Sequence, residues 1–84
     1  MYIVVIGMGE VGRHLAGTLA AEGHRVVAVD NSAASLELAT EHADLQTMQG
    51  HGSALPVLRE AGAAHADLVI AVSDSDEVNL LAAI

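Results

Sequence analysis

The chain has 84 residues and a net charge of −8, with three Lys or Arg residues and no Cys. This length allows one small domain, and the acidic excess argues against a nucleic-acid surface or an anionic-membrane surface. Without cysteine the chain forms no disulfide and performs no thiolate chemistry. No apolar run reaches the ~18–20 residues of a membrane span. We therefore expect a cytosolic domain that binds no nucleic acid and does not insert into the membrane.

The first thirty residues predict a strand, a glycine turn, a helix and a second strand, in that order. Residues 2–6 are a short β-branched apolar run without alternation, which is typical of a strand buried on both faces. A helical pattern of apolar residues follows over 10–22, and Gly23 is expected to end it. Residues 25–29 form the second expected strand, which Asp30 closes.

The turn after the first strand has the spacing G-x-G-x-x-G of a dinucleotide-binding fingerprint. The first glycine permits a tight turn, the second lets the backbone approach a pyrophosphate, and the third allows close helix–strand packing. Free N–H groups and the helix dipole would hold the phosphates. Asp30, about 20 residues further on, is placed to accept the ribose hydroxyls of an adenosine. Because its carboxylate would repel a 2′-phosphate, NAD(H) or an unphosphorylated adenine nucleotide is favoured over NADP(H).

The next residues extend the pattern to a third strand. Asn31 and Ser32 can cap a second helix that ends near residue 42. Residues 45–49 then predict a third strand, whose polar side chains indicate an edge or half-covered position. The glycine-rich loop that begins at Gly50 follows this strand, at the end of the sheet where ligand-facing loops lie.

The last third of the chain predicts one more buried strand between two helices. A short helix is expected over 54–61, a strongly apolar strand over 68–72, and a last helix from residue 77. We thus expect an α/β fold, a Rossmann-like three-layer sandwich with a parallel sheet in strand order 3-2-1-4. Residues 1–84 would form one partial domain, truncated after the fourth strand and its helix.

Motifs from both halves of the chain point to one family. They are Gly7-Met8-Gly9-Glu10-Val11-Gly12, Val29-Asp30, Gly50-His51-Gly52-Ser53, Leu58-Arg59-Glu60-Ala61-Gly62 and Ala66-Asp67-Leu68-Val69-Ile70-Ala71-Val72-Ser73-Asp74-Ser75-Asp76-Glu77-Val78-Asn79. Together they resemble the nucleotide-binding lobe of the Trk/Ktr potassium-transport regulators, the RCK, KTN or TrkA-N domains. The second half makes this resemblance specific, because a plain dehydrogenase would share only the glycine turn.

The resemblance implies a regulatory role without catalysis. Such a lobe is a cytoplasmic sensor that binds NAD(H) or, alternatively, ADP or ATP. It lies at the inner face of the plasma membrane through its partner, a membrane potassium-translocating subunit. It also self-associates as a dimer or a larger ring, and it passes the state of its ligand to the transporter.

The resemblance also assigns residues to the nucleotide. The three motif glycines would hold the pyrophosphate and Asp30 the ribose, while Ser53 would lie near the adenine and Ser73 near the distal phosphate or ribose. The expected cofactor-binding residues are Gly7, Met8, Gly9, Glu10, Val11, Gly12, Asp30, Asn31, Gly50, His51, Ser53, Ala71 and Ser73. One loop departs from the family, because it reads Gly-His-Gly-Ser where Gly-Asp-Ala-Thr or Ser is usual, so no role for an Asp carries over.

Two other interpretations remain open from the sequence. The chain could be the N-terminal half of an NAD-dependent oxidoreductase, which would use the same glycines and Asp30, or an assembly module that binds no nucleotide. We expect no metal site, because the five histidines lack ligand spacing. The acidic residues at 74, 76 and 77 are explained by capping of the helix expected there.

Overall fold

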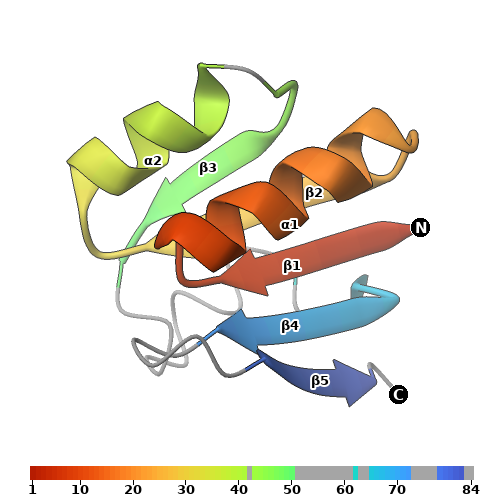
Figure 1. Ribbon diagram of the computed structural model, residues 1–84. Helices are drawn as coiled ribbons and strands as arrows, with labels where there is room; N and C mark the ends of the chain where they lie inside the picture. The colour runs from red at the N-terminus through yellow and green to blue at the C-terminus, as the bar shows by residue number, and fades with distance from the viewer. Residues whose placement is uncertain (42, 51–61, 63–64, 73–77, 83–84) are drawn as a thin grey trace.

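The structure is a computed structural model that describes residues 1–41, 43–50, 62, 65–72 and 78–82. Its elements are β1 (Tyr2–Ile6), α1 (Glu10–Ala21), β2 (Arg25–Asp30), α2 (Ala33–Thr40), β3 (Gln46–Gln49), β4 (Leu68–Val72) and β5 (Val78–Ala82). The strands form one sheet in the order β3-β2-β1-β4-β5, in which β1 to β4 are parallel (Figure 1). The expected order 3-2-1-4 of the parallel strands is confirmed.

The two central strands have the burial that their apolar, non-alternating sequences predict. β1 lies between β2 and β4, and its residues Val4 and Val5 are both 0% exposed although they point to opposite faces. β2 shows the same pattern at Ala28 and Val29. A strand covered on both faces cannot place polar residues on either one, and this explains the continuous apolar runs.

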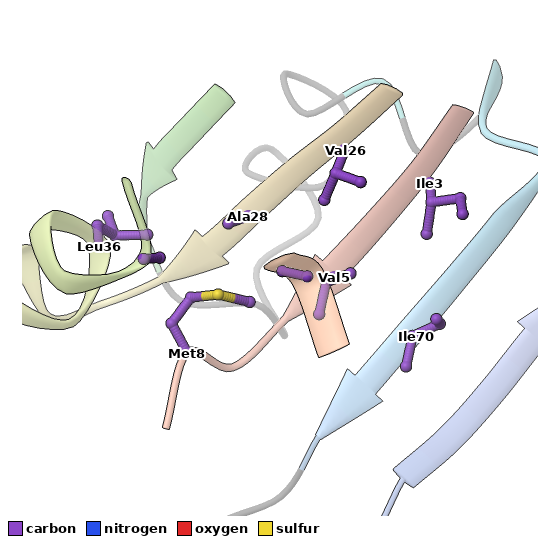
Figure 2. Close-up of a cluster of buried hydrophobic side chains, with 9 residues drawn as sticks. Ile3, Val5, Met8, Val26, Ala28, Leu36 and Ile70 are labelled. Atoms are coloured by element: carbon purple, nitrogen blue, oxygen red, sulfur yellow. The ribbon is translucent and has the colours of Figure 1, made fainter. Parts of the chain in front are cut away.

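One face of the sheet is covered by α1 and α2, which lie side by side above it (Figure 1). The core on this face combines side chains of three strands, both helices and the glycine turn (Figure 2). Its buried members are Ile3, Val5, Met8, Ala16, Val26, Ala28, Leu36, Ala39 and Ile70. Burial of such a continuous apolar layer is the main favourable term that holds this half of the fold together.

A second apolar cluster lies on the opposite face of the sheet. Its buried residues are Val4, Val27, Val29, Ala66 and Val69. Those that lie in strands alternate with residues of the first cluster, because successive side chains of a strand point to opposite faces. The helix expected over 54–61, which would form the third layer, lies outside the described residues.

The ends of both helices follow local signals in the sequence. α1 ends at Ala21, and Gly23 adopts a left-handed φ of 91° while its N–H donates to the Ala20 carbonyl at 3.0 Å. The Ser32 hydroxyl oxygen accepts the Ser35 N–H at 3.2 Å and so caps the start of α2. Neither helix, nor any other in the described part of the chain, is both long and apolar enough to cross a lipid bilayer.

The prediction of a helix from residue 77 is wrong for residues 78–82, which form the antiparallel strand β5. The register pairs Val72 with Val78 and Leu68 with Ala82 along the whole of β4. Short apolar runs are compatible with either a helix or a strand, so the local pattern does not decide between them. The free edge of β4 decides, because its backbone N–H and C=O groups are satisfied by β5.

Gly17 provides a test of helix α1 that does not involve the glycine turn. It lies inside the helix, and a Cβ there would meet its nearest neighbour, the Cβ of Ala43, at an ordinary 3.9 Å. Gly17→Ala should therefore stabilise the protein by about 0.5–1 kcal/mol, through helix propensity alone. Thermal unfolding should show a melting temperature higher by roughly 2–8 °C. A lower melting temperature would mean that α1 and residue 43 pack more tightly than described.

Candidate functional site

The candidate site lies where the carboxyl ends of the parallel strands meet. β1 and β4 end at the same edge of the sheet, while β5 runs the opposite way (Figure 1). The chain passes from β1 into α1 through residues 7–9, so the glycine turn lies at this edge. Ligands of doubly wound sheets bind outside the carboxyl ends of the strands, at the point where the strand order reverses. That point lies here between β1 and β4, because β2 and β3 extend the sheet in the other direction.

Two of the three motif glycines are required by the fold itself. Gly7 has a φ of 99°, and a Cβ there would collide with the backbone carbonyl oxygen of Val72 in β4. A Cβ on Gly12 would collide with the carbonyl oxygen of Gly7, because the first turn of α1 packs directly on the end of β1. These glycines thus bring the end of β1 close to β4 and to α1, as the fingerprint predicts for its first and third positions.

Gly9 differs from the other two glycines. Its φ of −66° and ψ of −172° are open to any residue. Apart from Gly9 itself and its two chain neighbours, no atom of the described structure lies within 4 Å of the position that a Cβ on Gly9 would take, and the residue is exposed. Neither backbone strain nor packing against the described residues explains why position 9 is a glycine.

The start of α1 presents backbone donors without acceptors. Arg13 is the first residue whose N–H enters the helical ladder, donating to the Gly9 carbonyl at 2.9 Å. Within the described structure, the N–H groups of residues 9–12 have no hydrogen-bond acceptor, and no side chain caps the helix. Four unpaired N–H groups together with the positive end of the helix dipole favour an anion.

Asp30 lies beside this turn, at the end of β2, and is half-buried. One carboxylate oxygen, Oδ2, accepts the Met8 N–H at 2.7 Å, and the other, Oδ1, accepts the Ser32 N–H at 2.8 Å. A carboxylate oxygen can accept two hydrogen bonds, so each still has capacity for one further donor. A pair of ribose hydroxyls is a ligand group that matches this remaining capacity.

The other residues of the turn contribute in different ways. Met8 is 0% exposed and its side chain lies in the core with Val5 and Leu36, so it has no side-chain surface for a ligand (Figure 2). Glu10 is exposed and Val11 half-buried at the start of α1. Glu10 and Val11 contribute their backbone N–H groups, which are two of the four unpaired donors at the start of α1.

The remaining predicted residues flank the site or lie outside the described structure. The Asn31 carbonyl accepts from Gln49 Nε2 at 3.3 Å, and the Gly50 N–H donates to the Asp30 carbonyl at 2.9 Å. Ala71 is half-buried in β4, in register with Ile6 at the end of β1. His51, Ser53 and Ser73 lie outside the described residues, so their expected roles remain predictions.

Backbone contacts of the site were not predicted from the sequence. Ser32 was expected only to cap α2, yet its N–H also binds Asp30. Val72 was expected only as a strand residue, yet its carbonyl oxygen lies against Gly7. No side-chain motif marks such contacts, because they depend on how the ends of separate strands come together.

A groove of about 490 Å³ lies between α1 and α2 and is distinct from the glycine turn. Its lining residues are Glu10, Arg13, His14, Gly17, Thr18, Ala21, Leu38, Ala39 and Ala43. It shares only Glu10 with the expected cofactor-binding residues. Because it includes none of the three motif glycines and not Asp30, it is not the predicted nucleotide site. Among the residues that the structure describes, no three His, Asp or Glu side chains gather as a metal-binding group.

The sequence is similar to those of known potassium uptake proteins. The chain is 45% identical to the Trk system potassium uptake protein TrkA of Haemophilus influenzae over 82 residues, which are 98% of this chain and 18% of that protein. A TrkA homolog of Archaeoglobus fulgidus is 42% identical, over 96% of this chain and 18% of the relative. The chain thus spans less than a fifth of the length of these two relatives.

A solved structure and a family profile complete the comparison. The Kef CTD of Shewanella denitrificans, in an AMP-bound form, has a TM-score of 0.65 at 22% identity, and the match covers 82% of this chain and 40% of that one. At this identity the likeness establishes the Rossmann-like fold. The profile of the TrkA-N domain matches residues 3–84. With this match and the relatives above, the chain belongs to the TrkA-N domain family, as the sequence resemblance predicted.

Proposed function

We propose that this chain is a nucleotide-binding regulatory lobe of a potassium uptake system. It binds NAD(H), or alternatively ADP or ATP, with the phosphates at the start of α1 and the adenosine ribose at Asp30. The state of the ligand is passed to a membrane potassium-translocating subunit. The role is regulatory, and the lobe catalyses no reaction.

The observation that carries this proposal is the contrast between Gly9 and the other two motif glycines. Gly7 and Gly12 have neighbours that exclude a Cβ, whereas no described atom lies near the corresponding position at Gly9. The same position adjoins four N–H groups that have no acceptor in the described structure. A phosphate that fills this space would use the donors and would require residue 9 to lack a side chain.

Asp30 favours a ribose with two free hydroxyls. Each of its carboxylate oxygens already accepts one backbone N–H and has capacity for one more donor. A 2′-phosphate would bring a second negative charge against the carboxylate, which supports NAD(H) over NADP(H). The Kef CTD was solved in an AMP-bound form, so a protein of this fold holds an adenine nucleotide.

The names of the relatives support the proposed partner and location. The curated relatives are named as potassium uptake proteins of the Trk system. This chain spans 18% of their length. The transport partner is therefore proposed for a whole protein in which this chain would be the nucleotide-binding lobe. We place that protein in the cytoplasm, at the inner face of the plasma membrane, and we propose that it self-associates as a dimer or larger ring.

The binding proposal is tested by calorimetric titration of the chain with NADH, NAD, ADP and ATP. We expect at least one of these to bind, and its 2′-deoxyribose analogue to bind about 10- to 100-fold more weakly, because one hydrogen bond to the Asp30 carboxylate is lost. NADPH should bind more weakly than NADH. Absence of heat with all four nucleotides, from a folded sample, would contradict the proposal.

A further inference from the structure

Asp30 joins three separate elements of the structure even without a ligand. Its Oδ2 accepts the Met8 N–H of the glycine turn at 2.7 Å, and its Oδ1 accepts the Ser32 N–H before α2 at 2.8 Å. Its backbone carbonyl accepts the Gly50 N–H at the end of β3, at 2.9 Å. One residue of β2 therefore binds the turn after β1, the start of α2 and the end of β3.

The two side-chain bonds supply acceptors that secondary structure does not. Met8 lies between β1, which ends at Ile6, and α1, which begins at Glu10, so its N–H belongs to neither ladder. Ser32 likewise precedes the first residue of α2. Hydrogen bonds from N–H groups to a carboxylate are short and roughly twice as strong as neutral ones. The Asp30 carboxylate thus replaces two missing backbone partners at once.

The position of Met8 makes this bond important for the site. The Met8 side chain is 0% exposed in the core, and its backbone connects Gly7, which packs on β4, with Gly9, which faces the open space. Fixing the Met8 N–H therefore fixes the residue immediately before the unpaired donors of α1. Donors that are held in place before binding lose less conformational freedom when a ligand arrives.

We propose that Asp30 is a positioning residue as well as a ribose contact: its carboxylate holds the glycine turn in its phosphate-binding conformation in the absence of ligand. The structural part of this inference is independent of the nucleotide. Its consequence for ligand affinity rests on the proposed function. A residue that serves only as a ribose contact would leave the turn, and the binding of a ligand without ribose, unaffected.

The structural part is tested by amide hydrogen exchange of the unliganded chain, measured by NMR on the wild type, Asp30→Ala and Asp30→Asn. In Asp30→Ala, the amides of Met8 and Ser32 should exchange at least 10-fold faster, while those of Val4 and Val27 in the sheet should change less than 2-fold. Asp30→Asn keeps the size of the side chain but has one acceptor oxygen, so at least one of the two amides should lose protection. Wild-type exchange rates at both amides in both variants would overturn the proposal.

The consequence for affinity is tested with inorganic pyrophosphate, which carries no ribose. Asp44→Asn is the matched control, because Asp44 is exposed and its substitution removes the same charge away from the site. Loss of a negative charge alone strengthens anion binding, so the control should bind pyrophosphate as tightly as the wild type or slightly more tightly. Asp30→Asn should instead bind it about 3- to 10-fold more weakly. Equal or tighter binding by Asp30→Asn would leave Asp30 as a ribose contact alone.

The exchange and binding experiments distinguish failure of the proposed nucleotide function from failure of the positioning role of Asp30. If no nucleotide and no pyrophosphate binds the folded wild type, the proposed function fails, and the exchange rates of Met8 and Ser32 still decide whether Asp30 holds the turn. If nucleotides bind but both amides exchange as in the wild type in both Asp30 variants, the positioning role fails and the nucleotide site stands.

Discussion

Gly12→Ala is expected to destabilise the protein by about 3 kcal/mol or more, which is the upper range of overpacking in a closely packed site. The added Cβ would overlap the carbonyl oxygen of Gly7. This atom belongs to the backbone and cannot rotate away as a flexible side chain would. Relief requires α1 to shift away from the end of β1, and the core formed by Ala16 and Val5 would shift with it. For a chain of this length the total stability is roughly 4–13 kcal/mol, so the loss is a large fraction.

Urea unfolding followed by circular dichroism measures this effect, and Gly17→Ala is its control. Both substitutions add one methyl group to the same helix, and the gain in helix propensity is similar in both. Only the surroundings differ, since the nearest neighbour at Gly17 lies at 3.9 Å. The two variants should therefore change stability in opposite directions. Equal stability of Gly12→Ala and the wild type would mean that α1 does not pack on the glycine turn as described.

The strands and helices of the first fifty residues could be predicted because local signals and tertiary burial agree there. The apolar run of β1 needs burial on both faces, and the sheet provides it between β2 and β4. Gly23 is expected to stop a helix, and it takes the left-handed conformation that such a stop uses. Ser32 is expected to cap α2, and its hydroxyl does so. Each element thus has a signal within its own few residues.

Residues 78–82 show where this agreement ends. Their pattern of Val and Leu predicts a helix, yet they pair with the free edge of β4. The deciding factor is the row of backbone donors and acceptors on β4, whose residues lie 6 to 14 positions earlier in the chain than their partners in β5. A reading of local periodicity contains no information about such an edge.

The candidate site was predictable in its residue types but not in its connections. The spacing of three glycines and Asp30 marks the phosphate and ribose positions, because each role demands a particular side chain or its absence. The bonds from Met8 and Ser32 to Asp30 involve backbone N–H groups, which every residue except proline has. Only the folded arrangement shows that one carboxylate serves the turn, the helix start and the proposed ligand.

Gly9→Ala should separate nucleotide binding from stability. Stability should fall by no more than about 1 kcal/mol, the preference of an N-cap for glycine over alanine, because the backbone angles suit alanine and the described structure leaves the Cβ position open. The same methyl group would stand in front of the unpaired N–H groups of α1, and it would displace a phosphate from them. Loss of charge-assisted hydrogen bonds at ~1.5–3 kcal/mol corresponds to binding that is about 10- to 100-fold weaker.

The measurement is calorimetric titration of Gly9→Ala with the nucleotide that binds the wild type best, beside unfolding curves of both proteins. Gly17→Ala serves again as the control, since the same change five residues beyond the last glycine of the motif should leave affinity within about 2-fold. Because Gly12→Ala should lower stability far more than Gly9→Ala, the pair distinguishes a glycine required by the fold from one required by a ligand. If Gly9→Ala bound the nucleotide as tightly as the wild type, the phosphates would not lie at the start of α1, and the site proposed here would be wrong.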